Sequence, residues 1–211
     1  MNNNYDFNVK RERPEEIYSE VSDYFKGDIL KQYANSKSII KTQEKITIRV
    51  LELLNLEKRN AIILDAGCGP GFASMYLNEI GYKTVAIDLI CSFLNYYDIK
   101  DLNPIVSDMC FPPFKPNTFD AIISISALQW IYRDINNEQM KKDLINLSKS
   151  FFNILKPNSR VIIQFYPKNK NILDRIGKII AEKTDFNGNF IIDNPNSAKK
   201  RKIYLLLEKG K

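Results

Sequence analysis

The stretch "ILDAGCGPG", residues 63–71, most constrains what this chain can fold into. A short apolar run ends in Asp65, and glycines follow at every second position before a helix-like segment. An apolar run bounded by turn residues is typical of a buried strand, and glycines let the backbone turn tightly and let a ligand approach bare main chain. The sequence therefore predicts a strand, a glycine loop and a helix whose N-terminal amides face a ligand.

Strand and helix patterns alternate along the rest of the chain. We predict strands at 61–67, 83–88, 104–108, 119–126, 160–166, 189–193 and 203–208, and helices at 14–36, 41–56, 73–80, 92–97, 138–155 and 172–183. Such alternation predicts an α/β fold, with a mostly parallel sheet and helices on both of its faces. With 211 residues, 44% of them apolar, one core and one domain are expected.

Several classes of protein are disfavoured by composition. No run of 18 apolar residues is present and residues 1–16 lack an apolar signal segment, so we expect a soluble intracellular protein without a membrane span. Three scattered cysteines favour neither a disulfide framework nor a metal site. The chain has no histidine, which removes imidazole-based acid and base catalysis. The formal net charge of +6 suits a polyanionic partner, or simply a soluble surface.

Two further strands are predicted to end in acidic residues. Ligands of doubly wound sheets bind beyond the carboxyl ends of the strands. Asp88, at the end of the second strand, is placed to accept hydrogen bonds from ribose hydroxyls, and Asp108, at the end of the third, from an adenine amino group beside the Met109 backbone. Phe72 stands where a dinucleotide fingerprint needs its third glycine, and no Lys-Ser/Thr pair completes a P-loop.

This order of glycine loop, acid and acid resembles the class I S-adenosylmethionine-dependent methyltransferases. The resemblance implies one Rossmann-like domain with a seven-stranded, mostly parallel sheet of order 3-2-1-4-5-7-6, and S-adenosyl-L-methionine as cofactor. It also implies a helical lid at residues 1–40 and a methyltransferase domain at 41–211. Tyr33 either closes over the cofactor or only packs this segment. The cofactor-binding residues implied are Tyr33, Asp65, Gly67, Cys68, Gly69, Gly71, Asp88, Leu89, Asp108, Met109 and Ser124.

Longer stretches resemble one family more closely, the eukaryotic and archaeal 18S/16S small-subunit rRNA (guanine-N7)-methyltransferases. They are "RPEEIY", "LELLNL", "ILDAGCGPG", "FDAIISISALQW", "LKPNSRVIIQFYPKN" and "DNPNSAKKRKIYLLL". The resemblance implies methylation of a guanine N7 in ribosomal RNA during ribosome biogenesis. It also implies a small zinc-binding activator subunit that adds a strand at the edge near residues 103–107. The long basic tail linked to nuclear targeting in eukaryotic members does not follow Lys211, so we expect a cytoplasmic protein.

The stretch "SISALQW", residues 124–130, is predicted to face the methyl acceptor. It lacks the Asn/Asp-Pro-Pro-Tyr/Phe turn of enzymes that methylate exocyclic amino groups, and an unprotonated N7 needs no general base. Gln129 is expected to hydrogen-bond a base edge, and Trp130 or Tyr166 to stack on a flipped purine, although Trp130 could equally be a core residue. The predicted RNA-backbone contacts, or alternatively solvated surface residues, are Lys168, Lys199, Lys200, Arg201 and Lys202.

Two other functions stay open at this point. "ALQW" at this strand end also resembles small-molecule carboxyl O-methyltransferases, which lack the "QFYPKN" and basic C-terminal stretches. The chain could also act as a ribosome-assembly factor whose methyl transfer is dispensable. Salt-sensitive RNA affinity would separate the enzyme on RNA from the enzyme on a small acid.

Overall fold

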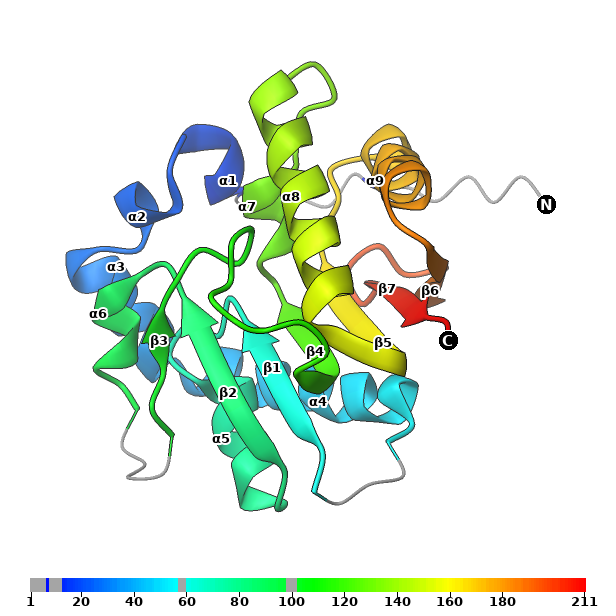
Figure 1. Cartoon of the computed structure of the whole chain (residues 1–211). Coiled ribbons are helices and arrows are strands. Elements are labelled where there is room, and N and C mark those ends of the chain that lie inside the picture. Colours follow the sequence, from blue (N-terminus) through cyan, green and yellow to red (C-terminus); the bar gives the residue numbers. More distant parts are fainter. Residues whose placement is uncertain (1–6, 8–12, 57–59, 98–101) are drawn as a thin grey trace.

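The computed structural model describes residues 7, 13–56, 60–97 and 102–211. Its seven strands form one sheet of order β3-β2-β1-β4-β5-β7-β6, in which β1 to β5 run parallel and β7 runs antiparallel to β5 and β6 (Figure 1). The strands are β1 Ile62–Ala66, β2 Lys83–Asp88, β3 Ile105–Val106, β4 Phe119–Ile125, β5 Leu155–Phe165, β6 Phe186–Asp193 and β7 Lys202–Lys209. The predicted fold class and strand order are confirmed.

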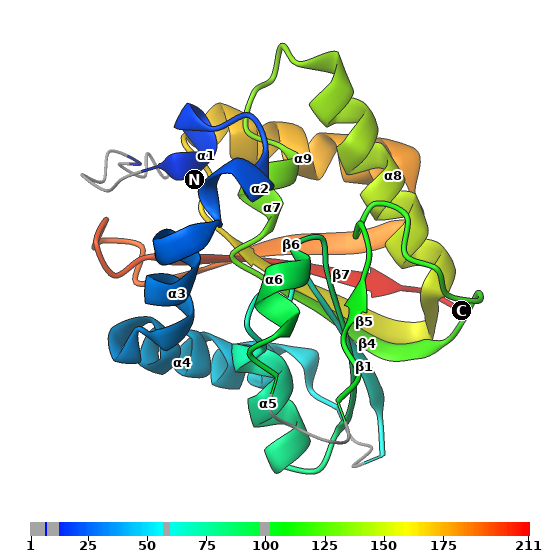
Figure 2. The same ribbon diagram turned by 90° about the vertical axis from the view of Figure 1, so that its left-hand side faces the viewer.

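Helices cover both faces of this sheet, as predicted. The long helices α4 and α5 lie on one face, and α8 and α9 lie on the other (Figure 2). The helices are α1 Pro14–Ile17, α2 Val21–Tyr24, α3 Gly27–Asn35, α4 Lys37–Leu54, α5 Phe72–Glu79, α6 Cys91–Leu94, α7 Leu128–Ile131, α8 Glu138–Ile154 and α9 Lys170–Lys183. No helix in the described part of the chain is long and apolar enough to cross a membrane.

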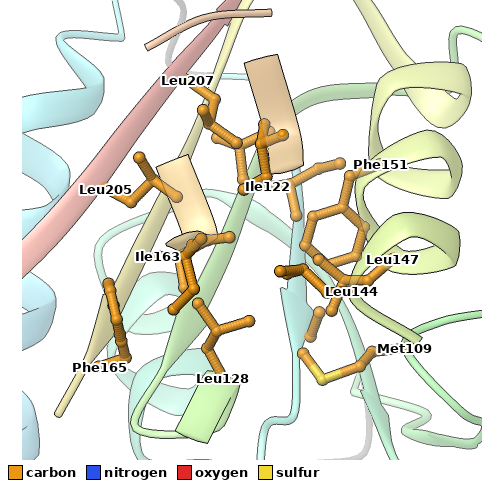
Figure 3. Packing of buried hydrophobic residues seen from close by; sticks show 14 of the residues in the cluster. Met109, Ile122, Leu128, Leu144, Leu147, Phe151, Ile163, Phe165, Leu205 and Leu207 are labelled. Carbon is orange, nitrogen blue, oxygen red and sulfur yellow. The ribbon is translucent and has the colours of Figure 1, made fainter. Parts of the chain in front are cut away.

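The face under α8 holds the larger core. Leu144, Leu147 and Phe151 repeat at helical spacing, are almost fully buried, and pack towards Ile122 and Ile163 of the sheet (Figure 3). Burying side chains of this size stabilises a fold by roughly 1.5–3 kcal/mol each. The helix begins where the Asn137 side chain accepts a hydrogen bond from the Met140 amide, 3.0 Å away. This packing holds β4 and β5 so that their carboxyl ends stay at one edge of the sheet.

The predicted segmentation is wrong in three places. Residues 14–36, predicted to be helical throughout, form three short helices, because the backbone is extended at Tyr18, Glu20 and Lys26 between them. Strand β5 begins at Leu155, although "KPNS" reads as a turn, because its first residue pairs with Phe119 across a register shift. The short helix α7, which carries Gln129 and Trp130, has no periodic signal of its own.

Long-range hydrogen bonds hold α1 and the turn after it against the carboxyl ends of the strands. Arg133 donates to the carbonyl of Ser19 at 3.1 Å, and Lys168 pairs with Glu16 at 2.9 Å. Arg13 donates to the carbonyl of Tyr166 at 3.3 Å. These contacts join segments more than 100 residues apart. They place the N-terminal helices over the edge of the sheet where a ligand site is predicted (Figure 2).

Candidate active site

The glycine loop between β1 and α5 needs its glycines for two different reasons. Gly67, Gly69 and Gly71 all have positive φ, at 77°, 54° and 89°, a region that L side chains rarely adopt. A Cβ at Gly67 would lie 2.7 Å from the Ala127 Cβ, and one at Gly71 2.5 Å from the Tyr97 ring. A Cβ at Gly69 would meet nothing within 4 Å. Two glycines therefore permit close packing, and the third leaves open main chain.

Asp88 ties this loop to the next strand end. One of its carboxylate oxygens accepts from the Gly69 amide at 2.7 Å, and the other from the Ile90 amide at 2.8 Å. Burial raises the pKa of Asp88, and the two amide hydrogen bonds oppose that rise. Each carboxylate oxygen has a second lone pair, so the group can still accept hydrogen bonds from two hydroxyls of a ligand.

Asp65 lies lower, at the end of β1, and is 1% exposed. It accepts a hydrogen bond from the Ser74 hydroxyl at 2.6 Å, and the Tyr97 hydroxyl donates to Ser74 at 3.3 Å. Burial raises the pKa of Asp65 to about 7, because the loss of water disfavours the charged carboxylate and Asp88 adds like-charge repulsion. The side chain links the loop to α5 and also borders the cavity above it.

A cavity opens above these strand ends, and we call it the cofactor cavity. Among the predicted cofactor residues, Leu89, Asp108 and Met109 extend its lining from β2 to the turn after β3. Asp108 accepts a hydrogen bond from the Cys110 amide at 2.8 Å, which closes a turn and orients the carboxylate. Nine predicted residues line this cavity: Tyr33, Asp65, Gly67, Cys68, Gly69, Asp88, Leu89, Asp108 and Met109.

Two predicted cofactor residues do not line the cavity. Gly71 faces the Tyr97 ring and lets α5 begin. Ser124 is 0% exposed inside β4, and Ser126, two residues further along, reaches the cavity wall instead. Ser124 and Ser126 are two residues apart, so both lie on the same face of the strand. Ser126 lines the cavity because the strand ends there, whereas Ser124 lies inside the sheet. The role of Ser124 as a cofactor contact stays a prediction that this placement does not support.

Aromatic side chains from the N-terminal helices close the cofactor cavity. Phe25 and Tyr33 lie with ring centroids 5.0 Å apart, and both contact Phe93 of α6, at 5.0 and 5.8 Å. Burial raises the pKa of the Tyr33 hydroxyl well above its ordinary value. Tyr33 packs in the cluster of Leu30, Ile90 and Phe93 and also borders the cavity, so its contact with the cofactor stays a prediction. Phe25 and Phe93 belong to no sequence motif, so the sequence alone did not indicate them.

Ser126 ends β4 in a backbone conformation that is unusual for a residue with a side chain, with φ of 60°. Its hydroxyl donates to the side-chain oxygen of Gln164 at 3.0 Å and accepts from the side-chain NH2 group of Gln43 at 3.3 Å. Its main-chain carbonyl accepts from the Gln129 side-chain amide at 2.7 Å. Side chains of three other segments, β5, α4 and α7, therefore fix this one residue at the point where the cofactor cavity meets its neighbour.

That neighbour, which we call the acceptor cavity, shares a wall with the cofactor cavity. Both are lined by Phe25, Tyr33, Gln43, Ser126 and Trp130. The acceptor cavity adds polar and aromatic residues from α1, α2, α4, α7 and the end of β5: Pro14, Glu15, Tyr24, Ser38, Ile39, Thr42, Gln129 and Tyr166. The three residues predicted to position the substrate, Gln129, Trp130 and Tyr166, are therefore together on one cavity.

Trp130 is a cavity residue, and the alternative of a core residue is not what the structure has. Its ring lies 6.0 Å from those of both Tyr24 and Phe25, and the side chain is only partly buried. The residues of this stretch that enter the core are Leu128 and Tyr132, at 0% and 1% exposure. Leu128 and Trp130 lie on different sides of the short helix α7, so Leu128 packs in the core and Trp130 lies next to Tyr24 and Phe25.

A third cavity, the basic cavity, adjoins the acceptor cavity through Tyr166, which lines both. Its cationic residues are Arg13, Lys199, Arg201 and Lys202. Lys202 lies 5.5 Å above the Tyr166 ring centre. Three of the five predicted RNA contacts are thus grouped beside the acceptor cavity.

The other two predicted RNA contacts lie elsewhere. Lys168 pairs with Glu16 of α1, and lines a separate cavity with Arg133 and Asp134. Lys200 is exposed, and its amide donates to the Ser197 carbonyl at 3.1 Å, which shapes the turn before β7. The sequence grouped Lys200 with Lys199 because the two are neighbours in the chain, and a sequence does not show the direction of each side chain.

Comparison with known proteins identifies the chain. A family model described as "Methyltransferase domain" matches residues 64–163. The 18S rRNA (guanine-N(7))-methyltransferase of Bos taurus is 35% identical over 192 residues, which cover 89% of this chain and 68% of that protein. The chain belongs to the 18S rRNA (guanine-N7)-methyltransferase family. The Saccharomyces cerevisiae 18S rRNA (guanine(1575)-N(7))-methyltransferase is 34% identical, covering 94% of this chain and 73% of that protein.

Solved structures agree with this family at the level of the fold. The protein PH0226 of Pyrococcus horikoshii superimposes with a TM-score of 0.66 at 16% identity, covering 89% of this chain and 98% of that one. The predicted family, the enzyme class and S-adenosylmethionine as the methyl donor are therefore confirmed for this 18S rRNA (guanine-N7)-methyltransferase family member. The residues at hand fit that cofactor, because open main chain at Gly69, paired acceptor oxygens at Asp88 and the apolar side chains of Phe25 and Phe93 line one cavity.

Proposed function

We propose that this chain transfers a methyl group to N7 of a guanine in small-subunit ribosomal RNA during ribosome biogenesis. The observation that carries the proposal is the wall that the cofactor and acceptor cavities share, formed by Ser126 and Trp130 among others. A methyl donor in one cavity and a base in the other meet at this wall. The names of the most similar relatives supply the base and the RNA.

The cofactor roles follow from the chemistry of each group. Asp88 accepts hydrogen bonds from the ribose hydroxyls, and Asp108 accepts from the adenine amino group beside the Met109 backbone. The main chain of Gly67, Cys68 and Gly69 lies along the methionine part of the cofactor, with Asp65 below it. The Cys68 thiol takes no part as a nucleophile, because burial raises its pKa.

Methyl transfer to N7 suits a site without a general base. S-adenosylmethionine supplies a methyl group on a sulfonium ion. The N7 lone pair forms the new N–C bond as the C–S bond breaks, the electron pair leaves on sulfur, and the positive charge passes to the purine. No proton moves, so the residues need only align the base and exclude water. Trp130 and Tyr166 do this by stacking on the base.

The N-terminal segment serves as the lid of this site. We retain residues 1–40 as the lid and 41–211 as the methyltransferase domain; residues 1–6 and 8–12 of the lid lie outside the described part. Phe25 and Tyr33 line both the cofactor and the acceptor cavity, so the lid covers both reactants. Arg133 and Lys168 hold its first turns to the body of the domain. Opening of the lid would admit the RNA.

The RNA backbone lies along the basic cavity in this proposal. Lys199, Arg201 and Lys202 neutralise phosphates next to the base in the acceptor cavity, and Tyr166 marks the boundary between base and backbone. Lys168 and Lys200, which lie outside this cavity, are further candidates for phosphate contacts. The basic residues favour RNA over a small carboxylic acid, which needs no extended positive surface.

A second chain completes the enzyme in our proposal. Strand β3 is at the edge of the sheet, and exposed apolar side chains surround it: Leu89, Ile105, Val106 and Phe111 are 52%, 37%, 51% and 62% exposed. An edge strand with apolar neighbours is suited to strand addition by a partner. We propose that a small zinc-binding activator subunit pairs with residues 103–107. Better solubility and cofactor affinity on co-expression would support this, and full solubility and affinity without it would contradict it.

Methyl mapping tests the proposed reaction. The protein and its proposed activator are incubated with tritiated S-adenosylmethionine and small ribosomal subunits from a strain that lacks the gene. We expect label in ribosomal RNA at one guanine, at which reduction and aniline cleave the chain. Label on a small acid, or none on RNA, would overturn the proposal.

Two variants extend this test. Asp88→Ala is the control that should bind no cofactor and leave the RNA unlabelled. Normal ribosome assembly with Asp88→Ala would point to a binding factor whose catalysis is dispensable. The cytoplasmic location expected from the sequence stays a prediction, for microscopy of the tagged protein to test.

A further inference from the structure

Glu15 is a buried carboxylate on the acceptor cavity that the proposed reaction does not use. It is 3% exposed and lies in α1, on the wall of the acceptor cavity but not of the cofactor cavity. Arg13 faces one of its oxygens at 3.7 Å and also donates to the Tyr166 carbonyl. Burial of a carboxylate costs free energy, and Arg13 offsets part of that cost from one side.

Gln129 adds a second hydrogen-bond acceptor to the same wall. Its side-chain nitrogen must be the atom that faces the Ser126 carbonyl, 2.7 Å away, because a carbonyl oxygen only accepts hydrogen bonds. That contact leaves the Gln129 carbonyl oxygen buried and, among the described residues, without a hydrogen-bond partner. A buried acceptor without a partner costs about 1–3 kcal/mol in a structural role, so its presence beside a cavity indicates a ligand.

Glu15 and Gln129 place two hydrogen-bond acceptors on one wall, so a base bound there must offer hydrogen-bond donors to them. Guanine presents two adjacent donors on its Watson–Crick edge, the N1–H and the 2-amino group. Adenine and cytosine each pair an amino donor with an unprotonated ring nitrogen there. A carboxylate accepts from both guanine donors at once, as it does from a planar guanidinium. The acceptor cavity therefore has the chemistry for guanine.

We propose that Glu15, supported by Gln129, is the specificity-determining residue that binds the N1–H and 2-amino edge of the target guanine; this rests on the proposed function. N7 lies on the opposite edge of the purine. Glu15 lies outside the wall that the two cavities share, so a guanine held at Glu15 directs N7 away from it and towards Ser126, Trp130 and the methyl donor.

The charge of Glu15 has a second consequence. Methylation at N7 leaves the purine with a positive charge, and a carboxylate within hydrogen-bond reach of that ring stabilises the charge as it develops. The same carboxylate favours N7-methylguanine over guanine once the reaction is over. A glutamine of the same shape would lose this charge stabilisation, and its NH2 group would face one of the two guanine donors in place of an acceptor oxygen.

The sole tryptophan of the chain, Trp130, reports on this cavity by its fluorescence. The experiment titrates the full chain, with its activator and S-adenosylhomocysteine, with guanosine, inosine, adenosine and 7-methylguanosine monophosphates. Inosine lacks only the 2-amino group. The wild type should bind guanosine monophosphate about 10-fold more tightly than the inosine and adenosine nucleotides, and the 7-methyl nucleotide more tightly still.

Glu15→Gln should reduce these preferences to within about 2-fold, and should lower kcat/KM for ribosomal RNA about 10-fold or more while cofactor affinity is unchanged. The matched control is Glu44→Gln, which removes an exposed charge of α4 that lines neither the cofactor cavity nor the acceptor cavity, and it should keep the wild-type preferences. Glu15→Asp, which keeps the charge one methylene shorter, should give an intermediate result and replaces Glu15→Gln if that variant does not fold.

The outcomes separate the two proposals. Discrimination of guanosine from inosine monophosphate that survives in both Glu15 variants, or no quenching by any guanine nucleotide in the wild type, overturns the role of Glu15. Normal discrimination by the wild type with no label on ribosomal RNA overturns the proposed substrate and leaves guanine binding by Glu15 intact.

Discussion

The cofactor cavity and the acceptor cavity are neighbours that are built in different ways. The first uses main chain at successive strand ends, where Gly69 and Ile90 donate to Asp88 within 22 residues of sequence. The second joins α1 to α7 and to the end of β5, more than 100 residues away. A universal cofactor needs one backbone geometry, whereas each acceptor needs its own side chains. The difference predicts that variants will separate cofactor binding from RNA binding.

The largest effect is expected at the glycine loop. Gly67→Ala puts a methyl group 2.7 Å from the Ala127 Cβ at a φ of 77°, so the loop must move and Asp88 loses its alignment. Calorimetry should show cofactor affinity at least about 100-fold lower, since several contacts to one ligand are lost together. Gly81→Ala is the matched control, because it has φ of 96° but open space around its Cβ. It should cost about 1–2 kcal/mol of stability and leave affinity unchanged; equal loss in both variants would refute the steric argument.

Asp65 should make stability depend on pH. Its pKa in the folded state is about 7, above its unfolded value of 3.8, so the folded state binds the extra proton and the protonated carboxyl stabilises the fold. This contribution is complete below pH 3.8 and is lost as the pH rises towards 7, at a rate on the order of 1 kcal/mol per pH unit.

Asp65→Asn cannot titrate, and its carbonyl oxygen can still accept from Ser74. Urea unfolding between pH 4.5 and 7.5 should therefore show the wild type losing stability relative to Asp65→Asn as the pH rises. The exposed Asp28 supplies the control, and Asp28→Asn should follow the wild type. Parallel profiles for the wild type and Asp65→Asn would contradict the raised pKa.

On the acceptor side, Tyr166→Ala should weaken RNA binding and spare the cofactor. Tyr166 lines the acceptor and basic cavities but not the cofactor cavity, and loss of a stacked base costs about 1–3 kcal/mol, or about 5- to 150-fold in kcat/KM. Tyr166→Phe keeps the ring and should retain most of the activity. A fall in cofactor affinity with Tyr166→Ala would show that the two cavities are not separable.

The smallest effect is expected at the basic cavity. Lys199→Gln should weaken RNA binding a few-fold and reduce the slope of log affinity against log salt concentration by about one. Lys115→Gln removes the same charge from an exposed position outside the cavities. Filter binding at several salt concentrations compares the two. Equal slopes in these variants would mean that Lys199 acts only through net charge.

Much of the fold was predictable because its signals are local. The order of apolar strands and amphipathic helices identified the sheet, and Asp65, Asp88 and Asp108 marked three strand ends in sequence. The breaks within residues 14–36 were not predicted, because the extended residues Tyr18, Glu20 and Lys26 and the packing of Phe25 against Phe93 decide where those helices begin and lie. Helix propensity alone does not contain that information.

The candidate site was predictable only in part, for a related reason. Gln129, Trp130 and Tyr166 were identified from a family resemblance and do meet at one cavity. Ser124 was chosen where Ser126 reaches the cavity, since only the bend at φ of 60° decides which serine is exposed. Glu15 was part of "RPEEIY", yet no spacing in the chain shows that it lines the same cavity as Gln129.

The sequence by itself determined the fold class, the cofactor loop and the family, because glycines at alternate positions and acids at strand ends act through the backbone close to where they occur. Only the tertiary structure decided which face of α7 lines the acceptor cavity and which lysines lie beside Tyr166. It also decided that Glu15 is buried at the acceptor cavity. These depend on the docking of the N-terminal helices onto the sheet. Contacts between such distant segments are set by packing and shape, which a linear pattern does not record.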